Sequence, residues 1–238
     1  MRVAAISSKR MPRLGWQGPY KVFSWSPMEI LVLELGPFAT NAFLLWNQGD
    51  SNAVLFDAPP GAEEALPKVL EERGLTLTDV YLTHGHWDHF AGLPELDDGS
   101  LQTWLHPDDR LLVEKPELAA SYVPPGTPMR PARIDHDLHP GQSLEILGQP
   151  CEVRHVPGHC PGNVLFYFKE QGFAIVGDAI FAGSIGRTDL PGGDFPTLET
   201  AVREQIYTLP DPTTLLPGHG PQTTVAQEKS SNPFVRPA

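Results

Sequence analysis

The chain has 238 residues, and its 29 Asp and Glu residues outnumber its 17 Lys and Arg residues, which gives a formal charge of −12. This acidic balance disfavours a nucleic-acid enzyme, because a surface that follows phosphates needs clustered Lys and Arg. Hydrophobic residues make up 40% of the chain, and no apolar run reaches the roughly 18 residues of a membrane span. Two cysteines are too few for a disulfide framework, so the cytoplasm is the predicted compartment.

The chain begins with a basic stretch, since residues 1–28 contain no acidic residue and five basic ones: Arg2, Lys9, Arg10, Arg13 and Lys21. This stretch is either an organelle-targeting segment or a strand and loop with solvated basic side chains. Branched and aromatic residues then predict nine strands, at residues 29–35, 42–46, 53–57, 80–83, 143–147, 152–156, 164–168, 173–176 and 214–216. Both interpretations of the N-terminus are compatible with these strands.

Amphipathic patterns predict helices at residues 62–73, 107–114 and 198–207. The segment 115–141 is rich in proline and has no periodicity, so it is predicted to be a long loop or lid rather than a linker between domains. Strands mixed with helices in this way are typical of an α/β or α+β protein, with two sheets covered by outer helices. Residues 1–238 are therefore predicted to form a single domain.

Metal-ligand residues follow directly on the predicted strand 80–83. The sequence there is His84-Gly85-His86-Trp87-Asp88-His89, which places three histidines and one carboxylate within six residues. Imidazole and carboxylate ligands together suit zinc, iron or manganese. A solvated loop that happens to be rich in histidine is the alternative, and this density of histidines disfavours it.

Three later strands end in a similar way, with a glycine followed by one residue of a ligand type. These pairs are Gly158-His159, Gly177-Asp178 and Gly218-His219. Each pair alone is weak evidence, because single His and Asp residues are common after strands. Together with the first cluster, they predict a metal site built from several strand ends.

The order His84-x-His86-x-Asp88-His89, His159, Asp178, His219 resembles the metallo-β-lactamase superfamily. The resemblance implies an αββα sandwich with two metal ions, zinc first and iron or manganese as alternatives. It implies that His84, His86 and His159 hold one metal. It further implies that Asp88, His89 and His219 hold the other, and that Asp178 bridges them.

Within that superfamily, the stretches around His159, Asp178 and His219, together with Gly186-Arg187-Thr188-Asp189, resemble the glyoxalase II group of hydroxyacylglutathione hydrolases. Only 19 residues follow His219, so a single-domain member without the C-terminal helical domain of full-length glyoxalase II enzymes is expected. Two other activities stay open. One is that of the mononuclear iron persulfide dioxygenases, whose ligand order this sequence also resembles. The other is that of a lactonase or β-lactamase.

The resemblance implies hydrolysis of a small thioester such as S-D-lactoylglutathione by a hydroxide between two metals, which Asp88 would orient. A thiolate leaves without a strong general acid, so thioesters fit better than lactams. Arg187 either binds the carboxylate of a glutathione conjugate or forms an ion pair with Asp189 or Asp194. The predicted partner is thus a small-molecule thioester, with no nucleic acid or membrane, and the protein is expected to be a monomer or homodimer.

Overall fold

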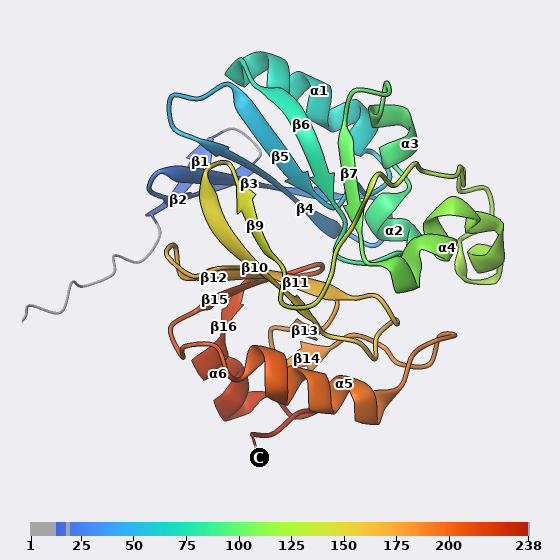
Figure 1. The fold of residues 1–238 in the computed structure, drawn as a ribbon, viewed down its shortest axis with the longest axis vertical. Coiled ribbons are helices and arrows are strands. Elements are labelled where there is room, and N and C mark those ends of the chain that lie inside the picture. The colour runs from blue at the N-terminus through green and yellow to red at the C-terminus, as the bar shows by residue number, and fades with distance from the viewer. Residues whose placement is uncertain (1–12, 18–19, 238) are drawn as a thin grey trace, which may run out of the picture.

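The computed structural model describes residues 13–17 and 20–237 and folds them into four layers, in the order helix, sheet, sheet, helix (Figure 1). One sheet has eight strands, in the order β1 to β8, and the other has six, in the order β16-β15-β12-β11-β10-β9. Strands β13 and β14 form a small hairpin of their own. The predicted αββα sandwich of two mixed sheets with outer helices is confirmed.

The first sheet consists of β1 (Arg13–Gln17), β2 (Tyr20–Trp25), β3 (Met28–Leu35), β4 (Thr40–Asn47), β5 (Asn52–Phe56), β6 (Thr76–Tyr81), β7 (Gln102–Leu105) and β8 (His136–Asp137). The remaining strands are β9 (Ser143–Ile146), β10 (Gln149–His155), β11 (Val164–Phe168), β12 (Phe173–Gly177), β13 (Ile180–Phe181), β14 (Ser184–Ile185), β15 (Thr214–Pro217) and β16 (Thr223–Thr224). All nine predicted strands are present.

The helices are α1 (Ala62–Arg73), α2 (Trp87–Phe90), α3 (Leu93–Leu96), α4 (Arg110–Glu114), α5 (Phe195–Ala201) and α6 (Val225–Ser231). Two 3-10 helices, η1 (Pro107–Asp109) and η2 (Pro116–Tyr122), and a π-helical turn, η3 (Val202–Ile206), complete the elements. Helix α1 covers the outer face of the first sheet, and α5 and α6 cover that of the second (Figure 1).

Three layers of buried apolar side chains hold the sandwich together. Residues such as Leu44 and Leu66 pack between the first sheet and its helices, whereas Phe56 and Phe166 pack between the two sheets. The third layer joins the second sheet to α5 and α6. Because β11 and β12 lie between two such layers, all of their residues are buried, which explains why both strands are continuous apolar runs.

The strand connections bring the carboxyl ends of several strands to one edge of the sandwich. Strands β5, β6, β7 and β8 are parallel neighbours in the first sheet, and β12 and β15 are parallel neighbours in the second. Parallel neighbours end on the same side of their sheet. Side chains that follow β6, β12 and β15 can therefore meet between the two sheets.

Two predicted helices and the Pro-rich segment differ from the expectation. The predicted helix 107–114 is split into η1 and α4, and the predicted helix 198–207 becomes α5 followed by η3. The segment 115–141 is not wholly irregular, since it contains η2 and β8, which pairs with β7. Proline at the first position starts η1 and η2, because its missing N–H costs nothing there.

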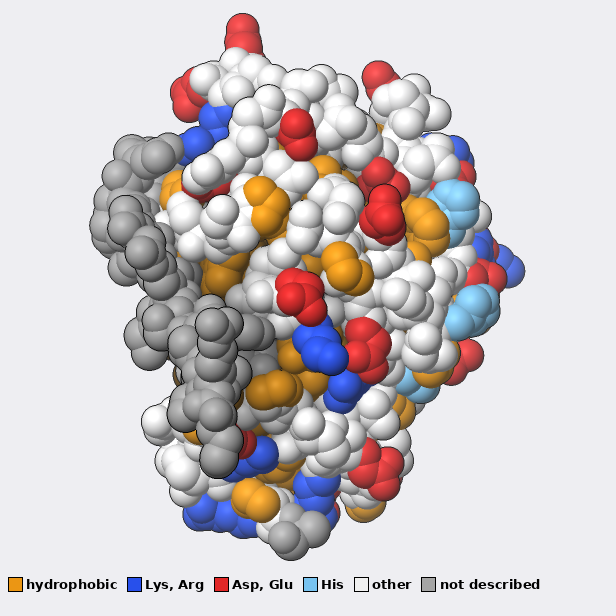
Figure 2. Space-filling model, turned by 60° about the vertical axis from the view of Figure 1, so that its left-hand side comes forward, with side chains coloured by type: hydrophobic (Ala, Val, Ile, Leu, Met, Phe, Trp, Pro, Cys, Tyr) orange, Lys and Arg blue, Asp and Glu red, His pale blue; other side chains and the backbone are white. Residues whose placement is uncertain are grey.

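The surface and the cysteines agree with the sequence composition. On the face shown in Figure 2, Lys and Arg side chains lie in small separate groups. Cys151 and Cys160 are buried and free. Within the described residues, none of the helices is long and apolar enough to cross a membrane. Arg2, Lys9 and Arg10 of the basic N-terminal stretch lie outside the described residues, so the question of a targeting segment stays open.

Candidate metal centre

The structure brings all seven sequence-predicted ligand residues to one place between the sheets. His84 and His86 lie in the loop after β6, and α2 carries Asp88 and His89. His159 follows β10, Asp178 follows β12, and His219 follows β15. Five of the seven are buried, and His86 and His219 are partly exposed. The assignment of these residues as ligands stays a prediction.

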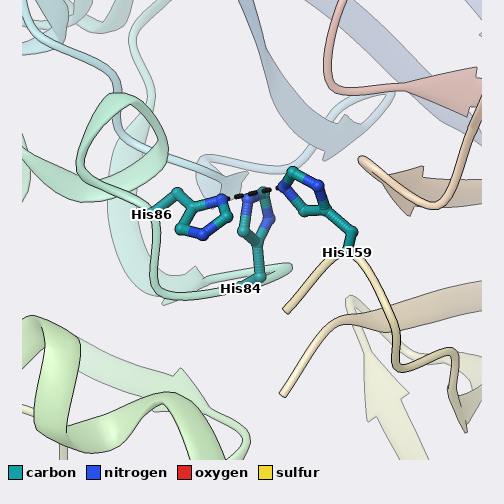
Figure 3. A group of neighbouring side chains, drawn as sticks. All are labelled: His84, His86 and His159. Atoms are coloured by element: carbon teal, nitrogen blue, oxygen red, sulfur yellow. Dashed lines mark hydrogen bonds between the residues drawn. The ribbon is translucent and has the colours of Figure 1, made fainter. Parts of the chain in front are cut away.

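The first group of donors, the three-histidine cluster, consists of His84, His86 and His159. Their rings converge from two loops of different sheets (Figure 3). His86 Nδ1 and His159 Nε2 are 2.8 Å apart, and the ring centroids of His84 and His159 are 5.0 Å apart. The ring nitrogens of this cluster thus face a common point, as the ligands of a cation do.

The second group, the Asp88 cluster, consists of Asp88, His89 and His219. Asp88 Oδ2 lies 3.3 Å from His219 Nε2 and 3.6 Å from His89 Nε2. Asp178 lies between the two clusters. Its Oδ2 atom is 3.6 Å from His159 Nε2 and 3.3 Å from His219 Nε2, and its Oδ1 atom is 3.4 Å from His89 Nε2. This is the position that a bridging carboxylate requires.

Buried atoms without hydrogen-bond partners test whether this site fits metal ions. Among the described residues, His84 Nε2, His89 Nε2 and Asp178 Oδ1 are fully buried and lack a partner. Leaving such atoms unpaired is costly, so a buried group of them indicates a bound species. Three imidazoles around one point and a mixed carboxylate–imidazole set around the next suit divalent zinc, iron or manganese. The donor set therefore fits a binuclear centre.

Residues behind the ligands fix their orientation, and sequence analysis missed most of them. The carboxylate of Asp57 accepts hydrogen bonds from the Thr83 N–H at 2.7 Å and the Thr83 hydroxyl at 2.9 Å, and it lies 2.8 Å from His89 Nδ1. Asp57 also has a φ of +60°, a strained conformation for a residue with a side chain. It follows strand β5 directly, so the strand-then-ligand pattern could have identified it.

Backbone carbonyls hold two other ligands in the tautomer that a metal needs. His159 Nδ1 lies 2.7 Å from the Arg187 carbonyl oxygen, and His219 Nδ1 lies 3.1 Å from that of Phe38. Each ring nitrogen donates its proton there, which leaves Nε2 free as a lone-pair donor. Asp88 Oδ2 accepts a hydrogen bond from the Thr40 hydroxyl at 3.1 Å. No side-chain pattern reveals a carbonyl contact of this kind.

The two clusters have opposite protonation preferences in the metal-free protein. Burial lowers the pKa of His84 well below its usual range, and burial together with His159 lowers the pKa of His86 to about 3. Burial also lowers the pKa of His89, but the carboxylates of Asp178, Asp88 and Asp57 outweigh it and raise that pKa well above its usual range. Burial also lowers the pKa of His219, but its hydrogen bonds to Asp178 and Asp88 outweigh burial and raise that pKa to about 10.

Metal binding is therefore expected to release protons. At pH 7 His89 and His219 are protonated in the metal-free protein, and a cation binds only neutral imidazole, so filling both clusters should release about two protons per chain. Affinity should rise with pH up to the pKa of His219, about 10, since fewer protons then compete. Calorimetric titrations in two buffers of different ionisation enthalpy measure this number. A heat that is independent of the buffer would contradict the expectation.

A cavity of about 330 Å³ opens onto both clusters. Its apolar wall is formed by Phe38, Trp87, Phe181 and Leu190, and the Phe38 and Trp87 rings meet edge to face at 5.1 Å. Arg187 also lines the cavity, and its Nε and Nη2 atoms donate to the two carboxylate oxygens of Asp189 at 2.7 and 2.8 Å. The ion pair with Asp189 is thus present in the structure.

One further group of possible ligands, His106, Asp108 and His155, lies apart from these clusters. The two rings stack in parallel with centroids 4.4 Å apart. His155 Nε2 faces the Pro161 carbonyl oxygen at 2.7 Å, and His106 Nδ1 accepts from the Asp108 N–H. Since these nitrogens are engaged within the fold, the pair packs the two sheets together.

Comparison with known proteins identifies the family. The sequence model of the metallo-beta-lactamase superfamily matches residues 35–219, a span that contains every predicted ligand. The chain belongs to the metallo-beta-lactamase superfamily. The resemblance seen in the ligand order is thereby confirmed, and the two mixed sheets with outer helices are the metallo-beta-lactamase fold.

Three relatives of this superfamily are informative. The hydroxyacylglutathione hydrolase GloC of Haemophilus influenzae is 36% identical, over 87% of this chain and 98% of its own. The crystal structure of the BLEG-1 B3 metallo-beta-lactamase superposes with a TM-score of 0.79 at 40% identity, covering 86% of this chain and 98% of that one. TTHA1623, solved in a di-iron-bound form, gives a TM-score of 0.74 at 36% identity, with coverages of 86% and 99%. Family and donor set together indicate a metal-dependent hydrolase with a binuclear-type site.

Proposed function

We propose that this protein is a binuclear metal-dependent hydrolase of small thioesters, with S-D-lactoylglutathione or a close relative as substrate. The observation that carries the proposal is Asp178, which directs one oxygen toward His89 of the Asp88 cluster and the other toward His159 of the three-histidine cluster and His219 of the Asp88 cluster. Both clusters face one cavity. A single ester carbonyl bound there can therefore reach both halves of the centre.

The residues around the centre have separate tasks in this reaction. When bound, two divalent cations lower the pKa of water and withdraw charge from a carbonyl oxygen. The Asp88 carboxylate, held by the Thr40 hydroxyl, accepts a proton from the attacking water and orients its lone pair toward the substrate. His219, at the mouth of the site, is fixed by the Phe38 carbonyl and so keeps the entry side of the centre in place.

The cavity supports a thiol leaving group. A thiolate, with a parent pKa near 8.5, departs without a proton donor, whereas an amine needs one. Among the described residues that line the cavity, neither Lys nor Tyr is present to protonate an amine. The apolar wall around Phe38, Trp87 and Phe181 suits the acyl and methylene parts of a small thioester.

Metal, substrate and setting complete the proposal. Zinc is the first choice, and iron is an alternative because TTHA1623 is described in a di-iron-bound form. The glutathione part of the substrate is supported by GloC, a hydroxyacylglutathione hydrolase. We further propose a cytoplasmic protein that acts on a small molecule as a monomer or homodimer.

The first test combines metal content with a substrate panel. Elemental analysis of protein purified without added metal should give about two metal ions per chain. Hydrolysis of S-D-lactoylglutathione, followed as released thiol, should then be faster than hydrolysis of nitrocefin or of a lactone. One iron per chain with oxygen uptake on glutathione persulfide would replace the proposal with a persulfide dioxygenase.

A second candidate, a β-lactamase, is favoured by the 40% identity to BLEG-1. It predicts that nitrocefin is turned over at least as fast as the thioester. The same substrate panel therefore separates the two activities on one preparation.

Replacing Arg187 with alanine tests substrate binding. If the guanidinium binds the carboxylate of a glutathione conjugate, KM should rise about 5- to 10-fold with little change in kcat, since an exposed charge-assisted hydrogen bond is lost. Steady-state kinetics on S-D-lactoylglutathione measures this split. Arg130→Ala is the matched control, because Arg130 is about as exposed and pairs with Glu95. Unchanged kinetics would leave Arg187 with only its Asp189 pairing.

A further inference from the structure

Asp109 is a buried carboxylate that belongs to neither donor cluster. It lies at the end of η1, and its side chain is fully buried. Its Oδ2 atom accepts hydrogen bonds from the Gly85 N–H at 2.8 Å and the Cys160 thiol at 3.1 Å, and its Oδ1 atom accepts one from the Gly162 N–H at 2.7 Å. Both oxygens are therefore occupied by donors from the chain.

These donors lie within the two loops that carry the three-histidine cluster. Gly85 stands between His84 and His86, and Cys160 directly follows His159. The two loops come from β6 in the first sheet and β10 in the second, which are not neighbours in any sheet. Asp109 thus connects the two loops that carry the three-histidine cluster.

Two glycines show how closely the loops approach this carboxylate. A Cβ on Gly85 would lie 2.9 Å from the Asp109 Cβ, and a Cβ on Gly162 would lie 2.6 Å from the Asp109 Cγ. Neither glycine has a positive φ, so the demand for glycine at these positions comes from the contact with Asp109.

We infer that Asp109 is the positioning residue of the three-histidine cluster, acting through Gly85 and Gly162. The Asp88 cluster has its own support, because Asp57 lies 2.8 Å from His89 Nδ1. Asp57 also reaches His84 through the Thr83 hydroxyl, which lies 3.0 Å from His84 Nδ1. Among the donors to Asp109, however, Gly85 and Cys160 directly flank ligands of the three-histidine cluster, and none directly flanks Asp88, His89 or His219. Loss of Asp109 therefore weakens the three-histidine cluster selectively. This inference rests on the proposed binuclear centre.

The test measures metal affinity at one cluster at a time. His219→Ala leaves the three-histidine cluster intact, and His86→Ala leaves the Asp88 cluster intact, so each background should bind one Zn²⁺ or Co²⁺. Asp109→Asn is then added to each. Asparagine keeps the shape but presents an NH₂ group to a backbone N–H, which breaks the bond to Gly85 or to Gly162.

In the His219→Ala background, Asp109→Asn should weaken Zn²⁺ affinity about 10- to 100-fold, as loss of a group that orients metal ligands does. In the His86→Ala background it should change affinity by less than about twofold, because the hydrogen bonds that Asp109 accepts come from Gly85, Cys160 and Gly162 and from no residue of the Asp88 cluster. Chelator competition gives both values, and the Co²⁺ visible spectrum should change only in the first background. Asp135→Asn is the control, since Asp135 accepts two bonds from Thr103 away from the site.

Each result decides one question. Equal loss of affinity in both backgrounds, or no loss in either, would overturn the inference. If Asp109→Asn does not fold, Gly162→Ala replaces it, since its Cβ pushes the His159 loop off Asp109 and should cause the same selective loss. If His219→Ala or His86→Ala alone binds no metal, the binuclear centre itself fails, whatever Asp109 does.

Discussion

Replacing Asp178 with asparagine is expected to remove metal and activity together. Asp178 lies between both clusters, and an amide cannot supply the second anionic oxygen. Metal affinity should fall by at least about 100-fold, since even groups behind the ligands contribute 10- to 100-fold. Hydrolysis should fall by at least about 1,000-fold, since losing one preorganised charge-stabilising group costs about 100- to 1,000-fold. Elemental analysis and thioester hydrolysis measure the two effects.

The matched control is Asp211→Asn, which makes the same chemical change at an exposed position. Asp211 pairs with Lys229 at the surface, and its side chain is exposed. It should keep the metal content and activity of the parent protein. Asp178→Asn protein that retains about two metals per chain would refute the bridging assignment. His84→Ala is also expected to lose metal, but at the three-histidine cluster and not at the Asp88 cluster.

The convergence of the candidate ligand residues could be predicted from the sequence because they follow the ends of strands. Apolar runs locate the strands, and parallel strands end at a common edge, so the order of the motifs implies their meeting in space. Asp57 obeys the same rule, but the predicted strand 53–57 absorbed it as its last residue, whereas β5 ends at Phe56. An error of one residue at a strand end was enough to conceal the group that supports His89.

The contacts that hold the ligand rings could not be predicted, because their partners are distant in sequence and have no signature. The Phe38 carbonyl meets His219 across 181 residues, and Asp109 meets Gly162 across 53.

The short elements were missed for a related reason. Helix α2 has four residues and β8 has two, so neither can display a period. Tertiary packing rather than local pattern determines such elements.

The glycine before each of the three later ligands has a steric origin that the structure makes visible. A Cβ on Gly158 would lie 2.3 Å from the Leu198 nitrogen, and one on Gly177 would lie 2.8 Å from the Thr83 hydroxyl oxygen. Both also have a positive φ, +121° and +53°. The glycine-then-ligand pattern therefore marks positions where a side chain would collide, with helix α5 at Gly158 and with Thr83, shortly after β6, at Gly177.

Gly218→Ala should disrupt the centre from within, with an effect second only to that of Asp178→Asn. A Cβ on Gly218 would lie 2.2 Å from Asp178 Oδ1 and 2.6 Å from a ring carbon of His89, so both side chains must move. Displacing ligands by about 1 Å costs on the order of 100-fold in rate. Metal content should drop, and hydrolysis should fall by that factor or more. Elemental analysis and kcat measured at saturating metal check the two effects.

Gly220→Ala, two residues along the same loop, distinguishes this collision from a general intolerance of side chains. Its Cβ meets nothing within 4 Å, although its φ of +72° adds backbone strain of about 1 kcal/mol. It should therefore lower thermal stability slightly and leave metal content at the parent level. Equal metal loss in both variants would mean that the loop, and not the contact between Gly218 and Asp178, governs the site. Loss of metal in Gly218→Ala alone would show that the metal centre requires a residue without a side chain at position 218.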